Sequence, residues 1–110
     1  MSDFDVRLSR GAETDLAELH TYFVTHRSAE QADALLDAIL SAVDSLESLP
    51  LRGPVPKELD ALGIREFRQI LVAPYRLIYR VIDQAVFVLV IADGRRDMQA
   101  LLERRLLGNA

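Results

Sequence analysis

The residues best suited to chemistry in this chain are arginines, which gather in its second half. Eight of the thirteen basic side chains lie in residues 61–110, and Lys57 is the only lysine. The arginines of the strand-like stretches are Arg65, Arg68, Arg76 and Arg80, and two more stand in Gly94-Arg95-Arg96-Asp97. A guanidinium group binds carboxylates and phosphates through paired hydrogen bonds. This pattern indicates a cationic surface for an acidic or polyanionic partner. The alternative is the solvated face of an amphipathic sheet.

Charge is unevenly distributed along the chain. The net charge is −4, because acidic side chains prevail in residues 1–60, although basic ones prevail in residues 61–110. Nucleic-acid binding that is driven by counterion release needs a clustered excess of positive charge. The composition therefore argues against a bulk nucleic-acid binder, and we expect no direct sequence-specific contact with nucleic acid.

The motifs of the common enzyme classes are missing from the sequence. It contains no GxSxG, Walker A or HExxH motif and no cysteine nucleophile. His20 and His26 are six residues apart, which places them on different faces of a helix, and they read as surface residues. Glu58, Asp60 and Glu66 could form a carboxylate acid/base site, or they are solvated charges of a loop and a strand edge. With no cysteine and two histidines, we expect no metal site and no cofactor.

Length and apolar content limit which architectures are possible. The 110 residues, half of them apolar, predict one domain, residues 1–110, with a real core. The N-terminal stretch MSDFDVRLSR has no apolar leader segment. The longest apolar run, residues 85–92, is too short to span a bilayer. We expect a soluble, cytoplasmic protein that makes no membrane contact.

The first half of the chain predicts one strand and two helices. Residues 4–8 alternate apolar and polar side chains, which is typical of a half-buried strand. Ser9 offers an N-cap oxygen, and apolar side chains then recur at three- and four-residue steps. Ser28 and Gln31 fit the capping box of a second helix, which Pro50 ends. Because the connection between the helices is very short, we expect an antiparallel helix hairpin.

The second half predicts a meander of strands. Residues 50–63, which contain three prolines and two glycines, read as a loop. Strands are predicted over residues 64–71, 75–82 and 86–91, with the turn Asp83-Gln84, and a last helix over residues 98–107. Tyr75 and Tyr79 share one strand face and read as core rings. Gly94 is expected to end the last strand with a positive φ. The sequence thus predicts an α+β fold with the helix hairpin on one face of an antiparallel sheet. The other face is open, or is covered by the last helix or by a partner.

Taken in order, these features resemble the RelE/ParE toxin superfamily over almost the whole chain. The residues that carry the resemblance are Ala12-x-x-Asp15-Leu16, Leu49-Pro50-x-x-Gly53, Ile64-Arg65-Glu66-Phe67, YRLIYRV at residues 75–81 and GRRD at residues 94–97. The resemblance implies a strand, a helix hairpin, a three-stranded antiparallel meander and a short C-terminal helix. It also implies the toxin of a type II toxin–antitoxin system, held in a hetero-oligomer by a cognate antitoxin that neutralises it.

Two activities divide the superfamily, and the sequence favours one of them. RelE-like toxins cut messenger RNA on the ribosome, with basic residues around the scissile phosphate, and ParE-like toxins inhibit DNA gyrase. A nuclease would use Arg68, Arg76 and Arg95 here. No tyrosine or histidine occurs beyond residue 79, so only Glu66 or Tyr75 remains as a base for proton transfer. We therefore favour the ParE-like interpretation, with no catalytic residue.

The same interpretation assigns two contact surfaces. The residues expected to bind the antitoxin are Arg65, Arg68, Arg76, Ile78 and Arg80. Those expected to bind the gyrase target are Arg95, Arg96, Met98, Arg104 and Arg105. We also expect growth inhibition and a role in plasmid stabilization. Truncation after Asp97 is expected to lower toxicity more than thermal stability. The remaining alternative is a non-toxic relative that acts as an antitoxin sink or co-repressor.

Overall fold

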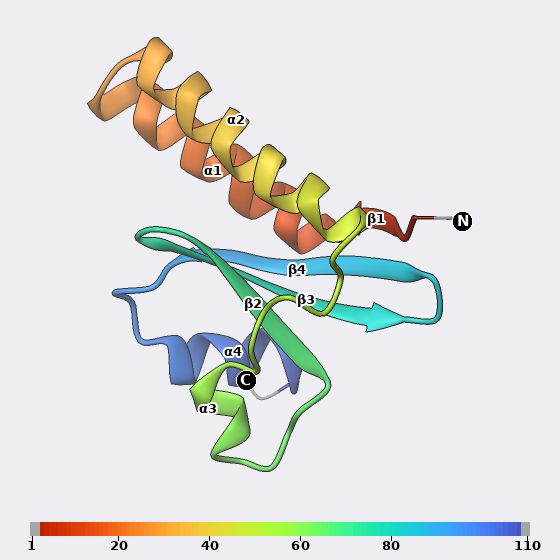
Figure 1. Cartoon of the computed structure of the whole chain (residues 1–110). Helices are drawn as coiled ribbons and strands as arrows, with labels where there is room; N and C mark the ends of the chain where they lie inside the picture. Colours follow the sequence, from red (N-terminus) through yellow and green to blue (C-terminus); the bar gives the residue numbers. More distant parts are fainter. Residues whose placement is uncertain (1–2, 109–110) are drawn as a thin grey trace.

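The structure, a computed structural model, describes residues 3–108. Its elements in chain order are β1 (Asp5–Leu8), α1 (Arg10–His26), α2 (Ala29–Asp44), the 3₁₀ turn η1 (Ser45–Glu47), α3 (Lys57–Asp60), β2 (Phe67–Val72), β3 (Tyr75–Ile82), β4 (Ala85–Asp93) and α4 (Met98–Leu106). The hairpin of α1 and α2 covers one face of the sheet, and the short helices α3 and α4 lie on the other (Figure 1). The predicted α+β fold is confirmed.

The four strands form a mixed sheet in the order β1-β4-β3-β2. β2, β3 and β4 make the antiparallel meander that the sequence predicts, and Asp83 adopts the positive φ of 55° that its tight turn requires. β1 lies on the outer side of β4 and pairs with it in parallel. The expectation of a purely antiparallel sheet is therefore wrong at this edge. A parallel neighbour needs a long crossover, which the helix hairpin provides.

Capping residues fix where the two long helices begin. The Ser9 hydroxyl accepts a hydrogen bond from the Ala12 amide at 3.1 Å, and the Ser28 hydroxyl accepts one from the Gln31 amide at 3.0 Å. Both caps were predicted, because a serine oxygen satisfies an amide that has no partner in the first helical turn. α2 ends at Asp44, earlier than the predicted end at Pro50, because the chain tightens into η1 there.

The sheet separates two apolar cores. The larger core lies under the hairpin, where α1 and α2 pack on Tyr75, Leu77 and Tyr79 of β3. The smaller core lies on the opposite face and includes Ile78, Val90, Met98 and Leu102. The alternation of β3 side chains between the two faces follows from strand geometry. Of the alternatives left open for the second face, the structure shows coverage by the last helix, together with α3.

Two departures from the predicted boundaries shape the rest of the molecule. The stretch read as a loop, residues 50–63, contains the helical turn α3, whose Leu59 is fully buried. β4 is longer than predicted and contains a bulge, because Tyr79 pairs with Val88 and Ile78 pairs with Val90. Leu89 therefore faces no residue of β3. Within residues 3–108, no helix is long and apolar enough to cross a membrane.

Candidate functional site

Arg76, which the sequence places on an open sheet face, is buried. Its side chain is 11% exposed and its Nη1 and Nη2 atoms donate to the two carboxylate oxygens of Glu58 at 2.9 and 2.7 Å. Nε donates to the Gln69 side-chain oxygen at 2.7 Å. The hydrogen bond from Arg76 is the main reason why the pKa of Glu58 lies below its ordinary value. Glu58, interpreted from the sequence as a solvated charge, is instead the partner that makes this burial tolerable.

Gly94 is part of the same arrangement. A Cβ atom at residue 94 would lie 2.7 Å from Cδ of Arg76, and the Gly94 amide donates to the Pro74 carbonyl at 2.8 Å. Its φ is not positive, so the predicted reason for this glycine is wrong. The glycine is needed because the Arg76 side chain passes directly beside the backbone. Ile78 is also fully buried, so neither Arg76 nor Ile78 is accessible on the surface.

Arg68 holds the loop between α2 and α3 against the sheet edge. Its Nη1 donates to the carbonyls of Gly53 at 2.7 Å and Leu51 at 3.3 Å. The Gly53 amide in turn donates to the hydroxyl of Tyr79, a fully buried core ring, at 3.1 Å. A Cβ atom at residue 53 would lie 2.1 Å from the Gln69 carbonyl oxygen. Arg68 is therefore committed to a structural contact.

The other two arginines that were predicted to lie on strands and to contact a partner remain reachable from solvent, although Arg65 lies before β2, which begins at Phe67 and not at the predicted residue 64. Arg65 is exposed and pairs with Asp60 at 2.5 Å. Arg80 is half-buried, and its guanidinium lies 5.7 Å from the ring centroid of Phe67. The five residues predicted to bind an antitoxin therefore do not form one surface, since two are buried and three lie at the periphery.

The Gly-Arg-Arg-Asp corner is fixed by an ion pair of its own. Arg95 donates from Nε and Nη2 to Asp93 at 2.9 and 2.6 Å, and its backbone amide donates to the same carboxylate at 2.9 Å. These hydrogen bonds lower the pKa of Asp93 to about 2. Asp97 caps α4 through the Ala100 amide at 3.1 Å. Arg96 is exposed at this corner.

The residues of α4 that were assigned to a target differ in their accessibility. Met98 is 3% exposed and belongs to the smaller core, whereas Arg104 is exposed. Arg105 turns inward and donates to both carboxylate oxygens of Asp15 in α1 at 3.0 Å. It also donates to the carbonyl of Leu89 at 3.0 Å. Arg105 thus provides a hydrogen-bond donor for the carbonyl of the bulge residue Leu89 and links α4 to α1.

An open groove of about 450 Å³ lies between α1 and the end of β4. Its apolar part comes from Phe23, Tyr75 and Ile91, and the two rings meet edge to face with centroids 6.4 Å apart. Arg27 and Arg96 line it as well, together with the Asp93–Arg95 pair, Asp15 and Glu18. In Figure 1 the hairpin slants away from β4 toward its tip. The residues that line the groove come mainly from the second half of α1, the end of β4 and the corner after it. We call it the β4-edge groove.

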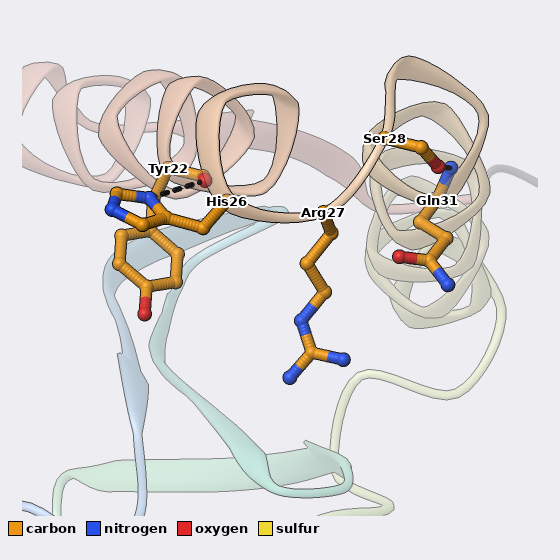
Figure 2. A pocket seen from close by; sticks show the side chains of 5 residues that line it. All are labelled: Tyr22, His26, Arg27, Ser28 and Gln31. Atoms are coloured by element: carbon orange, nitrogen blue, oxygen red, sulfur yellow. Dashed lines mark hydrogen bonds between the residues drawn. The ribbon is translucent and has the colours of Figure 1, made fainter.

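A second hollow of about 500 Å³ at the tip of the hairpin shares Tyr22 and Arg27 with the β4-edge groove. Figure 2 shows the ring of His26 stacked on Tyr22, with Arg27 extending from the tip on the side of the strands. The His26 Nδ1 atom donates a hydrogen bond to the Tyr22 carbonyl at 3.1 Å. Arg27 also lies 5.2 Å from the ring centroid of Phe23. The sequence did not indicate Arg27 as a site residue, because a single arginine between two helices gives no periodic signal.

The fold and the groove define a small α+β protein that presents an open, charged surface. The family model for the ParE toxin of type II toxin–antitoxin systems, parDE, matches residues 6–98. No curated protein gives a significant sequence match. Within residues 3–108, no group of histidine, cysteine or carboxylate side chains is placed to hold a metal ion.

Two solved structures share the fold. One is described as the chromosomal ParDE system of P. aeruginosa, with a TM-score of 0.68, 19% identity, and coverage of 82% of this chain and 95% of that one. The other is the toxin–antitoxin complex RelBE2 from Mycobacterium tuberculosis, with a TM-score of 0.60, 24% identity, and coverage of 83% and 98%. The chain belongs to the ParE toxin family, within the ParE/RelE superfamily of type II toxins.

Proposed function

We propose that this toxin acts by binding DNA gyrase, without nuclease chemistry, and that a cognate antitoxin neutralises it in a cytoplasmic complex. The observation that carries the proposal is the structural engagement of Arg76 and Arg68, two of the three arginines that a nuclease would need. Arg76 is buried against Glu58 and Arg68 holds two loop carbonyls, so only Arg95 stays exposed at the surface. A phosphate clamp needs guanidinium groups that are free to face the substrate.

The candidate bases also favour a binding mechanism. Tyr75 is 8% exposed, and burial raises its pKa, which makes the tyrosinate form needed for proton abstraction scarcer. Glu66 is exposed and precedes β2, whereas Arg95 follows β4. Because β2 and β4 run in the same direction on either side of β3, these two residues lie toward opposite ends of the sheet. Support for the gyrase-directed branch therefore comes from the local chemistry of these residues as well as from the family match.

Expression without antitoxin tests the proposal in cells. We expect growth arrest with filamentation and DNA-damage signalling, and recovery when the antitoxin from the neighbouring reading frame is expressed with it. Toeprinting on translating ribosomes should show no cleaved codons. Cleaved codons would establish the RelE-like activity instead, and unaffected growth would leave the non-toxic co-repressor.

The exposed arginines of the corner are the proposed target contacts. Arg95→Ala/Arg96→Ala should abolish growth arrest while the thermal midpoint stays near that of the wild type, since a fully exposed ion pair contributes little to stability. Arg7→Ala is the matched control, because it removes an exposed arginine paired with Asp5 in β1. Full growth arrest by the folded double variant would place the target contact elsewhere.

A further inference from the structure

β4 extends beyond its outer neighbour in the sheet. β1 pairs with residues 85–88 of β4, whereas β4 continues to Asp93. Two of the backbone groups on this free edge are satisfied by side chains: the Leu89 carbonyl accepts from Arg105 at 3.0 Å, and the Ile91 amide donates to Asp15 at 2.9 Å. Among the described residues, no strand covers the edge from residue 89 onward.

The rest of this edge presents backbone groups to the β4-edge groove. Because the Ile91 amide points outward to Asp15, the Ile91 carbonyl lies on the same outer side, and strand alternation places the Asp93 amide there too. Ile91 and Asp93 both line the groove. One donor and one acceptor therefore stand in line, at the spacing that an added strand uses.

The charges of the groove indicate what kind of segment would add there. Arg27 and Arg96 form no ion pair with any of residues 3–108, whereas Arg95 and Asp93 neutralise one another. Asp15 is likewise neutralised by Arg105. Glu18, on the α1 side, is the one other carboxylate that lines the groove. Two cations thus border an apolar surface made partly of Phe23.

We propose that an extended acidic segment of the antitoxin adds to the edge of β4 at Ile91–Asp93 and places carboxylates against Arg27 and Arg96. Strand addition obtains affinity from backbone hydrogen bonds and specificity from alternating side chains. An extended segment fits because a helix has no free backbone groups to offer this edge. This inference rests on the proposed antitoxin partner. It also explains neutralisation, because a segment bound here covers Arg96, which is proposed to contact the target.

Affinity measurements test the charge contacts. With the antitoxin from the neighbouring reading frame in isothermal titration calorimetry, Arg27→Ala and Arg96→Ala should each weaken binding about tenfold, and the double variant about a hundredfold. Arg7→Ala should bind like the wild type, because Arg7 pairs in register with Phe87 at the other end of β4. Thermal unfolding confirms that each variant is folded, and all three arginines are exposed.

Amide exchange tests the strand geometry independently of any variant. In the wild-type complex, NMR should show the Asp93 amide strongly protected relative to the free toxin. Unchanged affinity of the double variant would overturn the inference, and so would weakened binding without protection of Asp93, which would indicate a docked helix. A toxin that binds no antitoxin at all would remove the proposed function and this inference with it.

Discussion

At the residue scale, the contact between Arg76 and Glu58 decides that Arg76 stabilises the fold and is not available to a partner. Both side chains are nearly buried, at 11% and 12% exposure. Glu58→Ala would leave a buried guanidinium unpaired, so we expect a loss of about 3–5 kcal/mol in the free energy of unfolding. Asp60→Ala, which breaks the exposed pair with Arg65, should cost less than about 1 kcal/mol. Urea denaturation compares the two variants, and equal losses would contradict the buried pair.

The same pair predicts a pH dependence of stability. The folded-state pKa of Glu58 lies below its ordinary value of 4.5, chiefly because of the hydrogen bond from Arg76. The stabilisation is therefore complete above pH 4.5 and is lost as the pH falls through the lowered pKa. Glu58→Gln should make the thermal midpoint less sensitive to acid below this pH. An identical acid dependence in wild type and variant would exclude Glu58 as a contributor.

Replacing either of two glycines by alanine is predicted to destabilise the fold for steric reasons, and the loss should differ between them. A Cβ at Gly94 would lie 2.7 Å from Cδ of the Arg76 side chain, whereas a Cβ at Gly53 would lie 2.1 Å from the Gln69 carbonyl oxygen. Gly94→Ala should cost about 1–3 kcal/mol and Gly53→Ala more, since backbone yields less than a side chain. Calorimetric unfolding ranks them, and the reverse order would show that the corner is the stiffer of the two.

At the scale of elements, short-range signals were sufficient for most of the secondary structure. Ser9 and Ser28 cap α1 and α2 as predicted, and the turn at Asp83 closes the hairpin between β3 and β4. The parallel pairing of β1 and the buried role of Glu58 were missed. Both depend on partners far away in the sequence, and periodicity reports only on neighbours within one element.

The candidate site was harder to predict for the same reason. Asp15 and Arg105 are ninety residues apart, yet they form the contact that anchors α4. Arg27 gives no sequence signal beyond its charge, and the groove that it borders exists only after α1 packs beside β4. The corner arginines were singled out because two adjacent arginines follow a strand. The structure shows both exposed, with Arg95 paired to Asp93, and their contact with a target stays a prediction.

The last helix belongs to the folded core, which changes the expectation for truncation. Met98, Leu101 and Leu102 are nearly or fully buried against the sheet. Leu102→Ala should lower the free energy of unfolding by about 2–5 kcal/mol, and Arg104→Ala should leave it within about 0.5 kcal/mol. Chemical denaturation measures both. Truncation after Asp97 should therefore reduce stability together with toxicity, and a truncated chain as stable as the full one would show that α4 is dispensable to the fold.

At the scale of the whole molecule, the chain measures about 40 × 39 × 22 Å along its principal axes, and the hairpin tip projects beyond the sheet (Figure 1). Tyr22 and Val24 near this tip are 54% and 44% exposed. The tip, the β4-edge groove and the corner with Arg96 adjoin one another. A partner that binds along this side would contact all three, which fits the proposed binding mechanism.

Inhibition of gyrase is the central claim, and a supercoiling assay tests it most directly. Purified toxin added to DNA gyrase, relaxed plasmid and ATP should block the formation of supercoiled plasmid. The Arg95→Ala/Arg96→Ala variant should inhibit far less, the Arg7→Ala variant should inhibit like the wild type, and added antitoxin should restore supercoiling. Normal supercoiling in the presence of excess folded toxin would contradict the account.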